Sequence, residues 1–245
     1  MAYQRAYFPM KYVKVTQGYG SGTHKYSYAL DLAGKDTGKD EVYAPFDCKV
    51  TKLYQPSDRK KAPEVWLTST KKVLCSNGYY GYLTISLTHS TDVYNMRLGQ
   101  VFLQGQVVCH EGNQGVSSGN HIHLELSTGT TPGWDKNISN KYGAYVNVNK
   151  VKPEEYLFLK EDAVILQETK NGKTYHFKKE SELTYKVKGT DGSLTMRKTP
   201  KVALLNKIKT IKEGSEVIRF YSKNGWAYIY NYGNLGYVVD RYLKK

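Results

Sequence analysis

The sequence predicts an all-β protein, with an antiparallel β-sheet domain followed by a small barrel. Short runs rich in Val, Ile, Thr and Tyr alternate with Gly, Asn, Ser and Asp, and this pattern is typical of strands joined by tight turns. A sustained period of about 3.6 residues, which would indicate long helices, is missing from the sequence. We expect one short helical turn that begins with a proline, at 153–157. The expected strands lie at residues 12–15, 64–67, 82–87, 101–108, 121–126 and 217–221.

The length and composition leave room for more than one folded domain. The chain has 245 residues, of which 40% are hydrophobic and 13% aromatic, so each of two modest domains can bury a core. Asn171 and Gly172 lie in a polar stretch between two apolar flanks, and Asn-Gly is a strong hairpin-turn signal. We therefore place a first domain at 1–160, a linker or connecting hairpin at 161–182, and a second domain at 183–245.

The charge is concentrated in the C-terminal part. The net charge is +14, and residues 183–245 hold 13 Lys and Arg against four Asp and Glu. Such a surface attracts polyanions such as nucleic acid, anionic membrane or the teichoic polymers of a bacterial wall. A basic surface without a specific partner is the alternative.

The N-terminal sequence and the cysteines indicate whether the chain carries a secretory signal, a membrane anchor or disulfides. Residues 1–11 contain no continuous apolar run, so we expect neither a secretory signal nor a membrane anchor. Cys48, Cys75 and Cys109 are odd in number and share no close spacing, which predicts reduced, mostly packed thiols rather than disulfides or a cysteine zinc site.

Two histidines in one predicted strand are the strongest functional signal. His121 and His123 project from the same face, because residues two apart in a strand share a face. His24 lies in a glycine-rich stretch seven residues before Asp31. Zinc hydrolases use three protein ligands and leave a fourth position for water, and His24, Asp31 and His123 would supply these three. Alternating histidines also occur on ordinary strands, but the glycine-rich loop at 112–119 favours a site, because it lets backbone approach a substrate closely.

With these motifs, the chain resembles the lysostaphin-like (LytM-type) zinc metallopeptidases, which cleave peptides in bacterial peptidoglycan. The resemblance covers roughly residues 12–160 and implies an antiparallel β-sheet peptidase domain. The matching pieces, in the expected order, are His24 with Asp31, residues 43–50, residues 105–108, and residues 111–115 through 121–123.

The resemblance also implies roles for single residues. His24, Asp31 and His123 would bind Zn²⁺, which polarises the scissile carbonyl and supplies hydroxide. His121 would be a catalytic histidine that takes the proton of the water and returns it to the leaving amine. Tyr19 is the candidate for a tyrosine that stabilises the oxyanion of the tetrahedral intermediate.

One expected catalytic group is missing from its place in the family pattern. Met96 falls where the family has a second catalytic histidine, and a thioether cannot exchange a proton. His89 could replace that histidine only if the fold brings it close to the zinc; otherwise it is a packing or surface residue. His110 and His176 have no counterpart in the family and are interpreted as packing or surface histidines.

Residues 183–245 resemble a bacterial SH3-like domain, a small barrel that often tethers wall hydrolases to their substrate. Several short strands with glycine turns in about 60 residues suffice for one small barrel. Trp226, Tyr228 and Tyr237 would line a ligand groove or fill the core of the barrel. The matching pieces are residues 192–197, 213–217, 224–229, 236–239 and 242–243.

The sequence therefore supports a zinc endopeptidase that acts on peptidoglycan, such as a phage lysin or a virion-associated lytic enzyme. Without a signal, we expect it to be made in the cytoplasm and to reach the wall after release or in a phage particle. Its expected partners are peptidoglycan and anionic wall polymers, without nucleic acid or membrane; the oligomeric state stays open. The first alternative is a non-catalytic wall-binding or structural protein that retains the fold. The second, nucleic-acid binding, would require binding that weakens steeply with salt.

Overall fold

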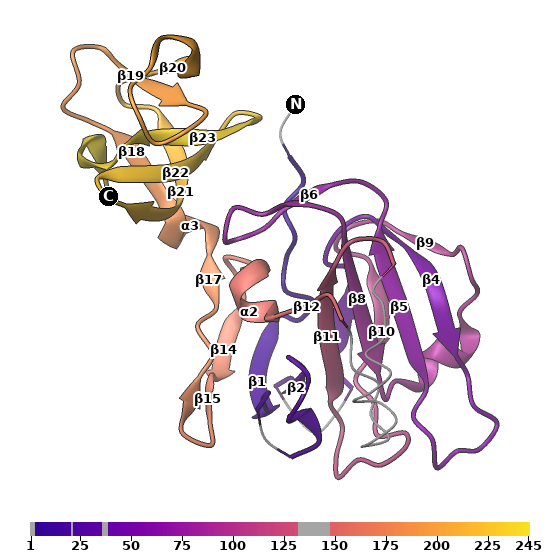
Figure 1. Cartoon of the computed structure of the whole chain (residues 1–245). Helices are drawn as coiled ribbons and strands as arrows, with labels where there is room; N and C mark the ends of the chain where they lie inside the picture. Colours follow the sequence, from indigo (N-terminus) through magenta and orange to yellow (C-terminus); the bar gives the residue numbers. More distant parts are fainter. Residues whose placement is uncertain (1–2, 21, 36–38, 132–147) are drawn as a thin grey trace.

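The computed structural model describes residues 3–20, 22–35, 39–131 and 148–245 and shows a nearly all-β chain, as the sequence predicts. Two β-rich units follow one another along the chain (Figure 1). The first unit ends with β17 (Lys178–Lys179), and the second begins with β18 (Thr184–Val187). One turn of helix, α3 (Glu180–Leu183), joins them.

A large sheet forms the framework of the first unit. Its strands lie in the order β14, β1, β2, β11, β8, β5, β4 and β9, and β12 pairs with β11 at one end. All of these pairs are antiparallel except β1 with β14. The strands are β1 (Tyr12–Gln17), β2 (Leu30–Ala33), β4 (Cys48–Tyr54), β5 (Glu64–Ser69), β8 (Leu83–Thr88), β9 (Val101–Phe102), β11 (Ile122–Thr128), β12 (Lys150–Val151) and β14 (Val164–Gln167).

Shorter elements surround this sheet. Two-stranded pairs form between β3 and β10, β6 and β7, β13 and β17, and β15 and β16. The elements are η1 (Gly22–His24), β3 (Glu41–Tyr43), β6 (Val73–Leu74), β7 (Tyr80–Gly81), η2 (Thr91–Asn95), β10 (Val107–His110), α2 (Pro153–Tyr156), β13 (Phe158–Leu159), β15 (Thr169–Lys170) and β16 (Lys173–Thr174).

Alternation along the central strands separates a core face from a polar face. Ile122, Leu124 and Leu126 of β11 are buried with the apolar core of the first unit. His123 and Glu125 lie between them in sequence and therefore point to the opposite face of the sheet. The polar face carries the candidate site.

Strands occur at all of the expected positions, but one of them is divided into two. The strand expected at 101–108 is interrupted between β9 and β10. Gly105 has a φ of +84° and its neighbour Gln106 donates a backbone hydrogen bond to Leu103, so a turn divides the run. The polar Gln104-Gly105-Gln106 segment is a signal for this turn, but the β-rich flanks on both sides led to the expectation of one continuous strand.

The segment expected to connect the two domains is packed on the first unit. β14 pairs with β1, and Tyr175 and Phe177 are buried in the first core. The expected Asn-Gly hairpin is confirmed: Asn171 and Gly172 have φ values of 52° and 74° between the paired strands β15 and β16. The part of this segment from β14 to β17 thus packs on the first unit, and α3 follows it as the connection to the second.

The second unit is a single antiparallel sheet folded around its own small core. The strands lie in the order β20, β19, β23, β22, β21, β18 and β24. Asn224 has a φ of 51° in the tight turn between β21 and β22, as expected for an Asn-Gly hairpin. The remaining elements are β19 (Ser193–Arg197), η3 (Leu204–Asn206), β20 (Lys207–Lys212), β21 (Glu216–Lys223), β22 (Trp226–Asn231), β23 (Asn234–Val239), η4 (Asp240–Tyr242) and β24 (Leu243–Lys244).

The two units share a third, smaller apolar cluster. Leu74 and Phe158 of the first unit pack in one cluster with Phe220 of the second. Beside it, the Arg5 guanidinium lies 2.7 Å from a Glu180 carboxylate oxygen. Within the described ranges, none of the helices has the length and apolar character needed to cross a membrane.

Candidate metal and histidine site

One carboxylate oxygen is the centre of the polar face. Oδ1 of Asp31 lies 3.0 Å from Nδ1 of His123, 3.3 Å from Nε2 of His24 and 3.7 Å from Nε2 of His121. Asp31 and His123 face each other directly in the pairing of β2 with β11. His24 comes from the turn η1 and is buried. The fold therefore brings together the four residues that the sequence singled out as ligands and catalytic histidine.

The protonation of these groups is strongly perturbed. Burial alone would raise the pKa of Asp31, but hydrogen bonds from His123 and His24 hold it well below the usual range of a carboxyl group. Burial would lower the pKa of His123, yet the carboxylates of Asp31 and Glu125 raise it to about 10. Without a cation, the group is thus a tight charge pair between Asp31 and His123.

The donor set fits a metal ion. His24, Asp31 and His123 each offer a ligand atom, and these atoms lie within 4.8 Å of one another. Two imidazole nitrogens, from His123 and His24, lie 3.0 and 3.3 Å from Asp31 Oδ1, so the three side chains face one small volume that a cation could share. Nδ1 of His24 is also buried without a hydrogen-bond partner among the described residues. Two imidazoles and one carboxylate are a ligand set of catalytic zinc sites.

Two further histidines form a pair beside this cluster. The ring centroids of His89 and His121 lie 4.5 Å apart. Nδ1 of His89 is 2.8 Å from the carbonyl oxygen of Gln114, and Nδ1 of His121 is 2.8 Å from that of Gly119. Because a carbonyl can only accept, each Nδ1 donates the hydrogen bond, which leaves Nε2 of each ring as the nitrogen that can accept a proton. Burial lowers the pKa of His89 to about 4, so this ring stays neutral near pH 7.

The glycine-rich loop at 112–119 positions this pair. A Cβ on Gly112 would lie 2.1 Å from the carbonyl oxygen of His89, and one on Gly115 would lie 2.7 Å from the backbone of Ala62. The two glycines let the loop pack closely against His89 and Ala62, and the close approach to a substrate stays a prediction. His89 itself has a φ of 81°, a conformation that non-glycine residues adopt at a cost and often at functional sites.

The structure places His89, and not Met96, next to His121. Met96 follows the turn η2, and its side chain is buried in the apolar core of the first unit. Its backbone oxygen accepts a hydrogen bond from Gln55. The thioether therefore has a packing environment, while the His89 ring lies beside His121 and 6.2 Å, between ring centroids, from the candidate ligand His123.

Tyr19 has a different set of contacts from those that an oxyanion role requires. Its hydroxyl donates a 2.6 Å hydrogen bond to the buried carboxylate of Glu154, and its ring packs edge-on against Tyr28 and Tyr175. Burial and the Glu154 hydrogen bond raise the pKa of Tyr19. Stabilising an oxyanion would require this hydroxyl to leave Glu154, so the role stays a prediction.

Two carboxylates near His123, those of Glu125 and Glu64, were not predicted from the sequence. Oε1 of Glu125 lies 3.6 Å from Nε2 of His123, on the side of the ring away from Asp31. Burial raises the pKa of Glu64, whose carboxylate accepts a 2.6 Å hydrogen bond from the Trp66 indole. The spacing of two residues from His123 could have revealed Glu125. Glu64 lies on β5 and reaches this face only through the pairing of β5 with β8.

The other histidines and cysteines lie outside the site. His110 pairs with Asp92 at 2.8 Å on the surface, and His176 is exposed. The three cysteines are free and buried, as expected.

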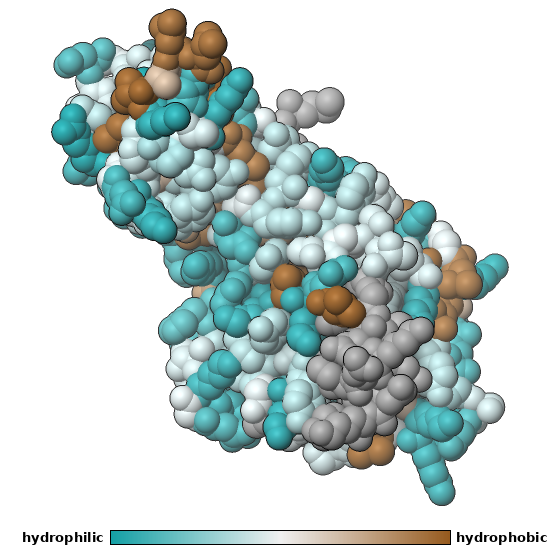
Figure 2. Space-filling model, in the orientation of Figure 1, coloured by the Kyte–Doolittle hydropathy of each residue, from teal (hydrophilic) through white to brown (hydrophobic). Residues whose placement is uncertain are grey.

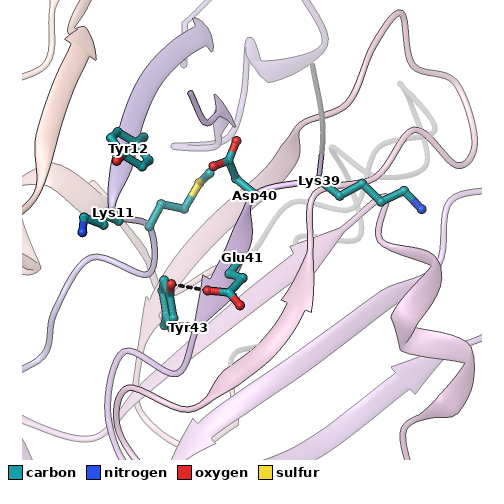
Figure 3. Close-up of a pocket in the computed structure, with 7 residues that line it drawn as sticks. Lys11, Tyr12, Lys39, Asp40, Glu41 and Tyr43 are labelled. Atoms are coloured by element: carbon teal, nitrogen blue, oxygen red, sulfur yellow. Dashed lines mark hydrogen bonds between the residues drawn. The ribbon is translucent and has the colours of Figure 1, made fainter. Parts of the chain in front are cut away.

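A separate hollow of about 260 Å³ opens near β1 and β3. Figure 3 shows Tyr43 hydrogen-bonded to Glu41 there, while Lys11 and Lys39 point away in opposite directions. None of the site histidines lines it. Its lining residues are Met10, Lys11, Tyr12, Lys39, Asp40, Glu41 and Tyr43.

Comparison with known sequences finds a relative that matches part of the chain. No protein-family model matches the chain. Over 136 residues the chain is 35% identical to Morphogenesis protein 1 of Bacillus phage B103. The match includes 54% of this chain and only 35% of that protein, about a third of its length.

Comparison with solved structures gives distant likenesses. Lysostaphin from Staphylococcus simulans has a TM-score of 0.40 at 15% identity, with 96% of this chain and 92% of that chain covered. A zinc-containing peptidase from Vibrio cholerae has a TM-score of 0.38 at 16% identity, with coverage of 61% and 40%. A mutant of the catalytic domain of EnpA from Enterococcus faecalis has a TM-score of 0.35 at 20% identity, with coverage of 48% and 82%. Similarities this distant do not establish a common function.

Proposed function

We propose that the chain is a zinc-dependent endopeptidase that cleaves peptide bonds in bacterial peptidoglycan. The observation that supports this most is the convergence of His24, Asp31 and His123 beside the histidine pair His89 and His121. Three ligand donors next to unprotonated imidazole nitrogens are what metal-assisted hydrolysis of an amide needs.

The side chains of this site divide the work of hydrolysis. His24, Asp31 and His123 would hold the zinc, which when bound supplies a Lewis acid and lowers the pKa of water to about 7. His121 accepts a proton at Nε2, because its Nδ1 is occupied by the Gly119 carbonyl. His89 stays neutral beside it and so adds no positive charge that would oppose protonation of His121. His121 then returns the proton to the leaving amine.

The second unit would bring the enzyme to its substrate. Its 13 Lys and Arg against four Asp and Glu favour anionic wall polymers. The SH3-like resemblance of residues 183–245 supports the same role. The phage relative fits an enzyme released at lysis or carried in a virion.

A non-catalytic virion component is the second candidate, and the name of the phage relative, a morphogenesis protein, favours it. This candidate predicts wall binding without cleavage. In a non-catalytic protein, the hydrogen bonds that orient the rings of His89 and His121 would serve no chemical function.

Lysis of purified cell walls separates the two candidates. The peptidase predicts wall lysis that stops on addition of a chelator, returns with zinc, and is lost in His121→Ala while zinc is retained. Zinc binding with wall binding but no cleavage on several wall types would favour the structural role, and a protein that binds no zinc would refute the proposed site.

A further inference from the structure

Three apolar side chains protrude together from the second unit. Val202, Leu204 and Leu205, on the connection between β19 and β20, are 76%, 95% and 89% exposed. Figure 2 shows strongly hydrophobic side chains gathered at the end of the second unit that lies away from the first. We call these three residues the apolar tip. Single exposed apolar residues are common, but three within four positions indicate an interaction site.

Hydrogen bonds hold the apolar tip in this exposed position. Asn206 is buried, and its side-chain amide bonds to Thr199 at 3.0 and 3.1 Å and to the carbonyl oxygen of Lys201 at 2.7 Å. Its backbone oxygen accepts from Lys198 at 2.8 Å. The loop is thus closed by one buried residue, and its apolar side chains do not reach the core.

The stretch of sequence that carries the apolar tip is basic. Residues 192–212 contain six Lys and Arg and no Asp or Glu. Lys198, Lys201 and Lys207 are exposed next to the tip in sequence. We call these three residues the lysine collar. The tip therefore combines apolar side chains with positive charge in one small area.

This combination selects the chemistry of the partner. A protein partner needs roughly 800 Å² on each side, which three protruding side chains do not supply. A nucleic acid or a soluble polyanion would use the lysines and leave the leucines exposed. A bilayer with anionic headgroups uses both, because the apolar residues enter the acyl boundary and the lysines meet the headgroups.

We propose that the apolar tip and the lysine collar dock the second unit on the surface of an anionic lipid bilayer. The contact is peripheral and needs no membrane-spanning segment. It does not depend on the proposed peptidase activity, and it would place the chain where a cell wall meets the underlying membrane.

Co-sedimentation of the full chain with lipid vesicles tests the proposal at about 0.15 M ionic strength. Binding is expected to vesicles of equal parts phosphatidylglycerol and phosphatidylcholine, and much less to phosphatidylcholine alone. Leu204→Ser/Leu205→Ser should weaken the binding at least about tenfold, since each leucine loses its burial in the acyl boundary. Lys198→Glu/Lys201→Glu should weaken it by about tenfold or more. The matched control is Leu103→Ser in the first unit, where the leucine is 58% exposed, and it should leave binding unchanged.

A label reports insertion directly. All three native cysteines are buried, so Leu204→Cys can be labelled selectively with an environment-sensitive fluorophore. Its emission should shift to the blue on phosphatidylglycerol vesicles, and the same label at Leu103→Cys should not shift.

Three results would overturn the proposal. The first is no binding to the anionic vesicles. The second is binding that Leu204→Ser/Leu205→Ser leaves intact, which would mean attraction by charge alone. The third is self-association that the same double variant abolishes, which would assign the apolar tip to a second copy of the chain.

Discussion

The first unit buries a histidine and several glutamates among its described residues, whereas the second unit buries no Lys, Arg, Asp or Glu. In the first unit His24, Glu125 and Glu154 are buried and bound to other polar groups or to one another. In the second unit no Lys or Arg is buried. The charge also differs: the first 182 residues hold 23 Lys and Arg against 18 Asp and Glu, and the remainder holds 13 against four.

This difference separates two ways in which side chains act. Buried groups shift each other's pKa and fix each other's orientation, so the first unit can do chemistry at defined atoms. Exposed charges act at longer range and depend on salt, so the second unit is suited to association with a polyanionic surface. Substitutions at the buried groups of the first unit should therefore alter metal binding and hydrolysis, whereas substitutions of surface charges in the second unit should not.

Removal of a metal ligand should have the largest effect. His123→Ala is expected to lose bound zinc and all detectable wall lysis, because the remaining donors cannot complete the site. His110→Ala is the matched control, since His110 is a surface histidine paired with Asp92. Zinc content and lysis should stay normal in the control. A zinc-loaded, active His123→Ala protein would contradict the ligand assignment.

Removal of one histidine of the pair should leave zinc bound and slow the reaction. His121→Ala is expected to lower kcat by about 10²–10⁴-fold, the usual contribution of general acid–base catalysis. His89→Ala is expected to lower kcat by a smaller factor, because His89 transfers no proton and only packs beside the His121 ring. Met96→Leu is the informative control, because it keeps an apolar side chain of similar size in the core and should retain activity. Normal kcat in His89→Ala would show that its place beside His121 has no catalytic use.

Glu125 should tune metal affinity without binding the metal. Glu125→Gln removes the charge that faces Nε2 of His123, and losses of this kind weaken metal affinity by about 10–100-fold. Competition with a chelator of known affinity measures the change. The control is Glu216→Gln on the exposed surface of the second unit. Equal metal affinity in Glu125→Gln and Glu216→Gln would show that Glu125 does not influence the metal site.

The loop that positions the histidine pair should not tolerate a methyl group at Gly112. Gly112→Ala places a Cβ 2.1 Å from the His89 carbonyl oxygen, and we expect it to lower the free energy of unfolding by about 1–3 kcal/mol. Gly119→Ala is the matched control, since a Cβ there meets nothing within 4 Å. Denaturant unfolding compares the two. Similar stabilities would show that the loop does not press on His89.

The stability of the chelated protein should depend on pH through the Asp31 and His123 pair. Folding raises the pKa of His123 from 6.5 to about 10, so its stabilisation is complete below 6.5 and is lost as the pH rises through about 10. Tm should therefore decrease as the pH is raised from 6.5 to about 10. Asp31→Asn should flatten this dependence, because the neutral amide no longer favours the protonated imidazole. An equal slope in both proteins would contradict the charge pair.

The sequence predicted the all-β fold, the hairpin at Asn171 and Gly172, and the grouping of His24, Asp31, His121 and His123. These features are local or follow from the alternation of a single strand. The turn at Gly105 was missed although Gln104 and Gln106 flank the glycine and a polar glycine segment within a strand pattern indicates an interruption.

The part of the site that could not be predicted depends on contacts between distant segments. His89 joins His121 only because the loop at 112–119 folds back on both of them. Glu64 reaches the polar face through strand pairing. Alignment by sequence alone put Met96 in the place of the histidine, since it cannot distinguish a core position from one that faces the site.

Release of new amino termini from purified peptidoglycan is the most direct test of the central claim. The protein is first stripped with a chelator, then supplied with one equivalent of zinc, and the soluble products are analysed by mass spectrometry. If the chain is a zinc peptidase with His121 as its base, peptide amines should appear only in the zinc-loaded sample, and His121→Ala with zinc bound should release almost none. Zinc bound at full occupancy with no released amines from several wall types would contradict it.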